Sequence, residues 1–298
     1  MKNQPFQPKL KINFLLLFFL FMACNTKNRI DIQGHRGCRG LFPENSLPAF
    51  EKAIDLGVNT LELDIGITKD KEVVVSHEPF MSRKICFNPA GNKIPKSMDM
   101  EYNLYKMSHD SIAQFDCGSK VHKSYPNQEK LRTYKPLLSE VFELAKAKKS
   151  DVRFNIEIKS KKKYYGIFTP HPKEYVEIVL DEVIKNNMLN RVIIQSFDMV
   201  ILKEVRIQSP KMPIALLVDE DEDIYFKISV LDVKPQPEVI SPYFELLDEK
   251  KVKNLQAANY KVIPWTVNDA EDLKRMVALE VDGIITDYPD RLIEILKE

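Results

Sequence analysis

From residue 29 onward, short β-branched runs alternate with amphipathic segments along the chain. The first unit shows the pattern, because the apolar run "RIDIQGH" is followed by "SLPAFEKAIDLG". One face of a helix over that second segment would carry Leu47, Phe50, Ala53 and Ile54. Gly57 would end the helix. The next strand, "TLELDIGIT", alternates apolar and polar positions, and "EVVVSHE" returns after the turn "KDK" as a hairpin.

Continuing this alternation predicts eight core strands, at 30–35, 60–65, 152–159, 191–197, 213–218, 238–244, 261–267 and 283–287. Eight strand-helix units in a chain of 298 residues favour a closed parallel barrel over an open doubly wound sheet. The chain has no Gly-rich loop of the nucleotide-binding kind, which weakens the open-sheet alternative. The expected fold is therefore α/β, a TIM-type (β/α)8 barrel.

Residues 79–136 interrupt the alternation. They are rich in Asn, Lys, Pro, Ser and Tyr and contain no long periodic run. A connection of this length inside a compact domain is uncommon and is usually functional. Because it leaves the hairpin that carries His77, we expect a small subdomain inserted above the same face of the barrel.

The N-terminus predicts a signal peptide over residues 1–24. Lysines precede the apolar run "INFLLLFFLFMAC", which is shorter than the ~20 residues that a membrane-spanning helix needs. The run ends in a lipobox-like Cys24, although Phe21 stands where such motifs usually have Leu. We expect an exported lipoprotein anchored to a membrane through a lipidated Cys24 and facing the periplasm, with residues 25–298 as its catalytic barrel. Ordinary cleavage near Cys24 is the alternative.

Composition narrows the choice of partners. Apolar residues make up 44% of the chain, enough for a large core, and the net charge is only +1. This balance gives no global attraction for nucleic acid, and it leaves the oligomeric state open. Export would place the three remaining cysteines in an oxidising compartment. Cys86 and Cys117 are the plausible disulfide pair, and Cys38 is expected to be a small buried residue.

Polar residues gather where the predicted barrel strands end, the place where barrel enzymes carry their chemistry. In chain order these positions supply His35, Arg36, Glu62, Asp64, His77, Glu78, Glu157, Lys159, Gln195, Tyr243, Trp265 and Asp287. Glu62 and Asp64 are two residues apart and share one face of a strand, as do Glu157 and Lys159.

Three carboxylates in one barrel mouth repel each other unless a cation lies between them. The oxygen ligands of Glu62, Asp64 and Glu157 suit Ca²⁺ or Mg²⁺, whereas the lack of a cysteine ligand makes zinc less apt. Arg36 and Lys159 would add fixed positive charge that can hold a phosphoryl oxygen.

Two histidines at the same mouth, His35 and His77, can divide general-acid and general-base roles. Each residue taken alone also has an ordinary structural explanation. Glu44 and Asn45 precede the first helix, and Asn45 is well placed as its N-cap. The joint arrangement across separate strands favours a functional site.

The linear order of these motifs closely resembles the glycerophosphodiester phosphodiesterase family. The segment "GHRG…PENSLPAFEKAIDLGVNTLELDIGITKDKEVVVSHE" carries the resemblance, and "NIEIK", "QSF", "PWTVN" and "DGIITDYP" extend it over about residues 30–298. Ser46 stands in place of the family's usual Thr, and Glu78 in place of the more common Asp.

The resemblance implies a divalent metal held by Glu62, Asp64 and Glu157, and two catalytic histidines, His35 and His77. It also implies an insertion after the second histidine, matching residues 79–136. Contacts to phosphate and substrate are expected from Arg36, Lys159, Glu44, Asn45, Gln195, Tyr243 and Trp265, the last two beside the glycerol or alcohol group.

The expected reaction is hydrolysis of a glycerophosphodiester to an alcohol and sn-glycerol 3-phosphate. We expect His35 as base and His77 as acid, but the sequence leaves the assignment open, as it does the choice between water and a substrate hydroxyl as nucleophile. A phospholipase or lysophospholipase of the C or D type on the same barrel is the nearest alternative, and the membrane anchor would suit it. A non-catalytic phosphodiester-binding lipoprotein is a third hypothesis.

Overall fold

The computed structural model of the chain describes Met1 and residues 30–98 and 100–298. The predicted signal peptide and Cys24 lie outside the described residues, so both remain predictions. Within the described part of the chain, no helix has the length and apolar character needed to cross a membrane.

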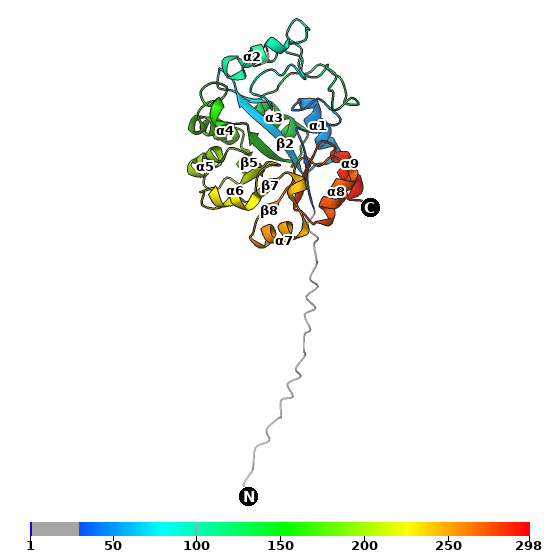
Figure 1. Ribbon diagram of the computed structural model, residues 1–298, viewed down its shortest axis with the longest axis vertical. Coiled ribbons are helices and arrows are strands. Elements are labelled where there is room, and N and C mark those ends of the chain that lie inside the picture. Colours follow the sequence, from blue (N-terminus) through cyan, green and yellow to red (C-terminus); the bar gives the residue numbers. More distant parts are fainter. Residues whose placement is uncertain (2–29, 99) are drawn as a thin grey trace.

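The described residues form a barrel of eight parallel strands, which confirms the predicted fold (Figure 1). The strands are β1 (Asp31–Gly34), β2 (Thr60–Ile67), β4 (Arg153–Ile158), β5 (Val192–Ser196), β6 (Ile214–Val218), β7 (Val239–Pro242), β8 (Lys261–Val262) and β9 (Gly283–Thr286). Their spatial order is β8-β7-β6-β5-β4-β2-β1-β9. Backbone hydrogen bonds close the remaining gap, from Asp282 N to Val262 O (2.9 Å) and from Ile285 N to Pro264 O (3.0 Å).

Helices on the outside of the barrel connect the strands (Figure 1). They are α1 (Leu47–Leu56), α3 (Leu138–Ala147), α4 (Pro172–Lys185), α5 (Met199–Gln208), α6 (Ile224–Val230), α7 (Glu249–Ala257), α8 (Ala270–Ala278) and α9 (Pro289–Ile295). Along β2, Leu61, Leu63 and Ile65 point outward into the main core between sheet and helices. The alternation therefore turns Glu62 and Asp64 toward the barrel interior.

Helix α1 ends at Gly57 as predicted, in the left-handed conformation with φ 88°. The prediction of Asn45 as its N-cap is wrong. Ser46 has the extended backbone that an N-cap requires, and its hydroxyl accepts a hydrogen bond from Ala49 N. Asn45 instead has a positive φ of 53°, which turns its side chain toward the barrel.

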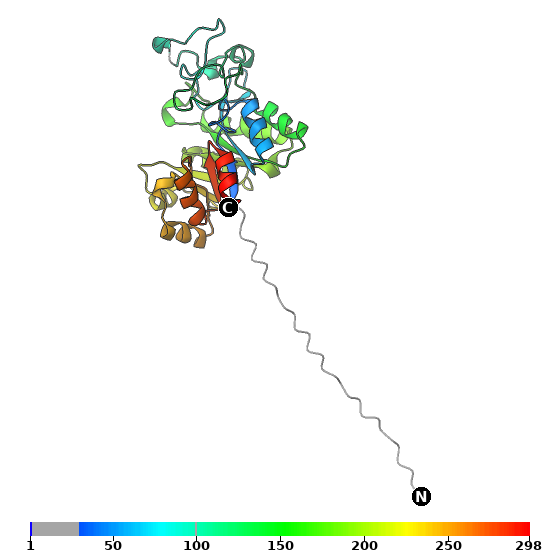
Figure 2. The ribbon, with the colours of Figure 1, turned by 90° about the vertical axis from the view of Figure 1, so that its right-hand side faces the viewer.

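The hairpin strand β3 (Val73–Val75) pairs antiparallel with β2, and residues 79–136 follow it. That segment contains η1 (Lys96–Met98), η2 (Leu104–Lys106) and the short helix α2 (His109–Ile112). Two views at right angles place it at one end of the barrel (Figures 1 and 2). Cys86 and Cys117 form a disulfide within its own apolar cluster, whereas Cys38 is unpaired among the described cysteines and buried.

Candidate active site

A cavity of about 190 Å³ opens where the barrel strands end. The predicted site residues that line it are His35, Arg36, Glu62, His77, Glu157, Lys159, Gln195 and Trp265. A larger cavity of about 480 Å³ adjoins it, since both are lined by His77, Glu157, Lys159 and Phe197. The outer cavity extends to Phe80 of the inserted segment. We call these the inner and outer cavities.

Three buried carboxylates meet beside the inner cavity, which Glu62 and Glu157 line and Asp64 adjoins from behind them in the sheet. Glu62 and Asp64 come from β2, and the strand register places Glu157 of β4 beside Asp64. One oxygen from each lies within 4.8 Å of the others. Burial and the charges of Asp64 and Glu157 raise the pKa of Glu62 well above its usual value. Oxygen ligands under such mutual repulsion fit a divalent cation of the Ca²⁺ or Mg²⁺ type.

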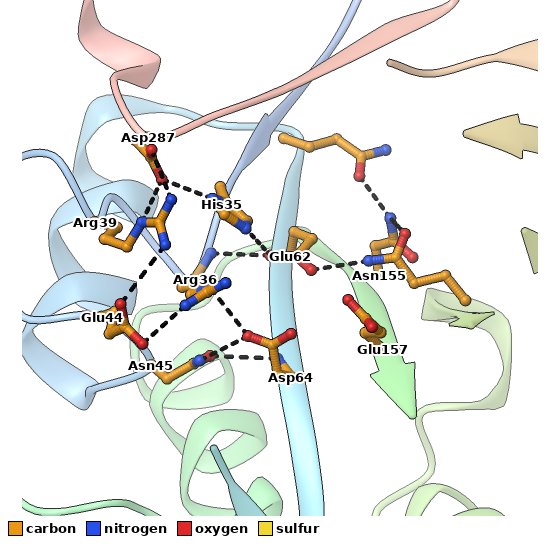
Figure 3. Close-up of polar contacts among 12 residues, drawn as sticks. His35, Arg36, Arg39, Glu44, Asn45, Glu62, Asp64, Asn155, Glu157 and Asp287 are labelled. Carbon is orange, nitrogen blue, oxygen red and sulfur yellow. Dashed lines mark hydrogen bonds and ion pairs between the residues drawn. The ribbon is translucent and has the colours of Figure 1, made fainter. Parts of the chain in front are cut away.

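Neighbouring donors hold these carboxylates in place. Glu62 accepts hydrogen bonds from the backbone N of Arg36 (3.0 Å) and from Nε2 of Gln195 (2.8 Å). Nδ2 of Asn45 donates to Asp64 (2.9 Å), as Figure 3 shows. These hydrogen bonds fix the orientation of Glu62 and Asp64 within the triad.

Arg36 and Lys159 bring two permanent charges to the triad. The Arg36 guanidinium lies 2.9 Å from Glu44 and 3.1 Å from Asp64, and Lys159 Nζ lies 2.8 Å from Glu157. Burial works against the charge on Arg36, but Glu44 and Asp64 outweigh it and raise its pKa. Both side chains also line the inner cavity, where they can bind an anionic group of a substrate.

Arg36 contacts two carboxylates of the triad, and the backbone conformation around it explains how. Arg36 has a φ of 50° and Gly37 a φ of 88°, so the chain turns sharply after β1. A Cβ on Gly37 would lie 2.7 Å from the backbone of Ala49, so a larger residue does not fit. This turn directs the Arg36 N–H to Glu62 while the guanidinium reaches Asp64.

His35 is held by Asp287, which follows β9. The distance from His35 Nδ1 to Asp287 Oδ1 is 2.6 Å, and Nε2 lies 3.9 Å from Glu62. Burial would raise the pKa of Asp287, but His35 and Arg39 hold it well below its usual range. An ionised Asp287 accepts a hydrogen bond from Nδ1–H of His35. The neutral ring therefore carries its proton on Nδ1, and Nε2 is unprotonated.

Burial lowers the pKa of His35 to about 4, with Asp287 acting in the opposite direction. The ring is therefore neutral near pH 7 and can accept a proton at Nε2. This protonation state suits a general base.

Asp287 connects several elements. It accepts hydrogen bonds from Arg39 Nε (2.9 Å), from Tyr125 of the inserted segment (2.6 Å) and from Asn268 Nδ2 (2.7 Å). Its side chain has no exposed surface. The carboxylate that orients His35 is thus itself fixed by three donors. Figure 3 shows the contacts of Asp287 with His35 and Arg39.

His77, which also lines the inner cavity, shows the same arrangement. Its Nδ1 lies 3.1 Å from Oε2 of Glu78, and the ring lines both the inner and the outer cavity. Burial would raise the pKa of Glu78, but the hydrogen bond and charge of His77, followed by the charge of Lys135, lower it to about 2. Each histidine therefore faces an ionised carboxylate through Nδ1.

The remaining predicted residues lie at different distances from the cavity. Trp265 lines it, with Nε1 donating to Ser241 O (2.9 Å). Glu44 and Asn45 lie behind the cavity, where they hold Arg36 and Asp64. Tyr243 is not among the described residues that line either cavity, although its ring centroid is 5.9 Å from that of Trp265.

Sequence reasoning missed several residues of this site. Arg39 and Asn268 lie inside motifs that the sequence displays, "GHRGCRG" and "PWTVN", so their proximity to the strand ends was a usable signal. Asp287 was predicted to lie at the end of the last strand, but no role was assigned to it. Tyr125 had no signal, because it comes from the irregular segment 79–136.

Comparison with known proteins places the chain in a family. The model of the glycerophosphoryl diester phosphodiesterase family matches residues 35–291. A glycerophosphodiester phosphodiesterase of Caldanaerobacter subterraneus is 33% identical over 269 residues, which cover 89% of this chain and 96% of the relative.

Solved structures agree with this placement. The crystal structure of a glycerophosphoryl diester phosphodiesterase family protein from Silicibacter pomeroyi has a TM-score of 0.82 at 28% identity, covering 91% of this chain and 94% of that one. A phosphodiesterase of Oleispira antarctica, solved with the product sn-glycerol-3-phosphate, has a TM-score of 0.71 at 20% identity over 90% and 97% of the two chains, a likeness of fold. This chain belongs to the glycerophosphoryl diester phosphodiesterase family and is an enzyme of that family.

Proposed function

We propose that the protein hydrolyses glycerophosphodiesters to an alcohol and sn-glycerol 3-phosphate, using a divalent cation and two histidines as general base and acid. The observation that carries this proposal is the pair of histidines that line one cavity beside a buried carboxylate triad. Each histidine is bound through Nδ1 to a carboxylate, at 2.6 Å and 3.1 Å, and both rings line one cavity. The family and the names of relatives support the substrate class.

The cation would be held by Glu62, Asp64 and Glu157. These residues fit it, because burial and mutual repulsion raise the pKa values of Glu62 and Glu157, and a bound cation would relieve that repulsion. A divalent ion there would supply Lewis-acid stabilisation of charge on the phosphoryl group. The oxygen-only donor set supports Ca²⁺ or Mg²⁺ over zinc.

The two histidines would transfer the protons. His35 Nε2 takes a proton from the attacking hydroxyl, either of water or of the substrate's glycerol, as the new P–O bond forms. Attack by the glycerol hydroxyl would give a cyclic glycerol phosphate, which water would then open to sn-glycerol 3-phosphate. His77 gives a proton from Nε2 to the leaving alkoxide as the bond between phosphorus and the alkoxide oxygen breaks. The unequal environments support this order, since the buried His35 is neutral near pH 7 and the partly exposed His77 adjoins the outer cavity.

The phosphate would lie against Arg36 and Lys159, whose charges border the triad. Gln195 and Trp265 line the same cavity and would contact the glycerol moiety. Tyr243 would act there only at the cavity rim, through its contact with Trp265. The leaving alcohol would occupy the outer cavity.

We also propose that the protein is exported and anchored through a lipidated Cys24, facing the periplasm. The sequence of residues 1–24 supports this. The Cys86–Cys117 disulfide is consistent with it, because such bonds persist in oxidising compartments.

A substrate comparison tests the proposed function. The purified protein with Ca²⁺ or Mg²⁺ is expected to release sn-glycerol 3-phosphate from glycerophosphocholine, measured by a coupled dehydrogenase assay. A second candidate is lysophospholipid hydrolysis, since Pro79, Phe80 and Phe197 give the outer cavity an apolar wall. Faster turnover of lysophosphatidylcholine than of glycerophosphocholine would favour this second function instead.

Replacing Asp287 by asparagine is expected to lower kcat by roughly 10²-fold or more, because the amide no longer fixes the proton of His35 on Nδ1. The variant also removes the buried carboxylate nearest to Arg39, which leaves Arg39 only Glu44 at 3.7 Å. We therefore expect a loss of about 3–5 kcal/mol of stability by urea unfolding. Asp55→Asn is the control, because that carboxylate is exposed and its ion pair with Lys148 is worth at most about 1 kcal/mol. Wild-type kcat in Asp287→Asn would contradict the proposed role of Asp287.

A further inference from the structure

A lysine-rich segment forms one wall of the outer cavity. It follows β4 directly, reads "KSKKKYY" over residues 159–165 and contains η3 (Lys162–Tyr164). Its residues that line the cavity are Lys159, Ser160, Lys161, Lys162 and Tyr164. Neither Lys161 nor Lys162 has a role in the proposed reaction. Because the leaving alcohol would occupy the outer cavity, this wall would meet its head group.

The lysine-rich segment is held from two sides. Asp198, which precedes α5, accepts hydrogen bonds from Ser160 Oγ (2.7 Å) and Tyr165 Oη (2.5 Å). Just beyond the segment, Ile167 O accepts a hydrogen bond from Nδ2 of Asn103 in the inserted segment (2.7 Å). The wall is therefore tied both to the barrel and to the insertion.

The carboxylates at this cavity already have partners. Glu78 lies 3.1 Å from His77 Nδ1, and Glu157 lies 2.8 Å from Lys159 Nζ. Asp198 accepts the two hydrogen bonds described above. A cationic head group would therefore find no carboxylate without a partner among the described residues that line the cavity.

Lys161 and Lys162 differ from these carboxylates. Both side chains are exposed, and neither ammonium group makes a hydrogen bond or ion pair within the part of the chain that the structure describes. The permanent charges that line this cavity and have no described partner are therefore positive. An anionic group is the complementary ligand, because each ammonium group offers a full charge and three hydrogen-bond donors.

The aromatic rings of the cavity also disfavour choline. Proteins usually bind a quaternary ammonium against the faces of aromatic rings. The ammonium groups of Lys159 and Lys227 lie 5.8 Å and 5.5 Å from the centroid of the Phe197 ring. Lys163 Nζ lies 5.4 Å from the centroid of the Tyr164 ring. Cations of the protein thus already lie against two of the rings that choline would need, and like charges repel.

We propose that Lys161 and Lys162 form a subsite for an anionic head group on the leaving alcohol. The enzyme would then prefer glycerophosphodiesters whose alcohol carries a sulfonate, carboxylate or phosphate over those whose alcohol is choline. This inference rests on the proposed function, because it concerns the alcohol that the reaction releases. The two lysines bind the head group and take no part in proton transfer, so choline diesters remain slower substrates.

Three diesters of sn-glycerol 3-phosphate test this subsite. Their leaving alcohols have a similar shape and differ in charge: isethionate is anionic, 3,3-dimethylbutanol is neutral and choline is cationic. The wild type is expected to have a higher kcat/KM for the isethionate diester than for the choline diester.

The double variant that combines Lys161→Gln with Lys162→Gln removes both charges. Its kcat/KM should fall about 5–10-fold for the isethionate diester, since exposed charge pairs are each worth at most about fivefold. For the choline diester kcat/KM should rise about twofold to fivefold, and for the neutral diester it should change less than about twofold. Comparing variant and wild type on the same substrate removes the intrinsic difference between leaving groups.

Lys163→Gln is the matched control. Lys163 is an exposed lysine of the same η3, but it is not among the residues that line the cavity. This variant should change kcat/KM less than about twofold with each of the three diesters. Raising the ionic strength from about 0.05 M to 0.5 M should reduce the wild-type preference for isethionate, because salt screens exposed charges.

The outcomes separate this inference from the proposed function. Equal changes with all three diesters in the double variant, or no change with any of them, would overturn the anionic subsite while leaving the hydrolysis intact. A wild type that favours the choline diester would overturn it as well. If the wild type hydrolyses none of the three diesters, the proposed function fails, and this inference fails with it.

Discussion

Chelation of divalent ions is expected to abolish the hydrolysis of glycerophosphocholine, and added Ca²⁺ or Mg²⁺ to restore it. The expected loss is at least about 10³-fold, because metal stabilisation of the transition state is worth several kcal/mol and about 1.4 kcal/mol is tenfold in rate. The physical basis is the triad of Glu62, Asp64 and Glu157, whose oxygens lie within 4.8 Å of one another. Full activity in EDTA would contradict the metal site.

The same site should be detectable without substrate. Added metal is expected to raise the melting temperature of the wild type, but not that of Asp64→Asn. Because the pKa of Glu62 is raised in the metal-free protein, a proton competes with the metal, and the metal-induced shift should shrink as the pH falls and grow as it rises. Glu72→Gln, an exposed position on the same hairpin, should keep the shift. A shift that grows toward low pH would contradict this account.

Replacing either histidine by alanine is expected to lower kcat by ~10²–10⁴-fold, the usual contribution of general acid–base catalysis. His35 is held 2.6 Å from Asp287 and His77 3.1 Å from Glu78, so each variant removes one half of a matched pair. Steady-state kinetics with glycerophosphocholine measures the loss. His171→Ala, an exposed histidine before α4, should leave kcat unchanged.

The leaving group distinguishes the two histidines. His77→Ala should regain activity with the 4-nitrophenyl diester of glycerol phosphate, because nitrophenolate leaves without needing a proton. His35→Ala should not regain activity with this substrate. The opposite pattern would exchange the base and acid roles. Near-wild-type activity of either variant with glycerophosphocholine would remove that histidine from the mechanism.

The barrel was predictable because its strands and helices have distinct periods. The alternation in "TLELDIGIT" identified both the outward residues of β2 and the inward pair, Glu62 and Asp64. Strand β8 is shorter than predicted, Lys261–Val262 rather than 261–267, because Pro264 has no N–H to donate to the sheet. The Asn45 cap prediction failed because backbone conformation, which composition does not reveal, makes Ser46 the cap.

The site residues that lie on the barrel strands or directly after them were predictable. The carboxylates and histidines follow from the period of two and from the common direction of parallel strand ends. Tyr125 was not predictable, because it comes from residues 79–136, whose path depends on the Cys86–Cys117 bridge and on tertiary contacts. The non-catalytic hypothesis required a missing carboxylate or histidine, and all of them are present.

Tyr125 gives the inserted segment a significance beyond substrate access. Its hydroxyl reaches Asp287 after the last strand, and Gln128 donates to the backbone carbonyls of Arg39 and Phe42. The insertion and the barrel therefore do not form exchangeable modules. Grafting another family member's insertion onto this barrel to alter head-group preference would also remove Tyr125. The Asp287 carboxylate that orients His35 would then lose one of its donors. A substitute insertion would have to supply its own hydroxyl to Asp287 and its own donor to the Arg39 and Phe42 carbonyls.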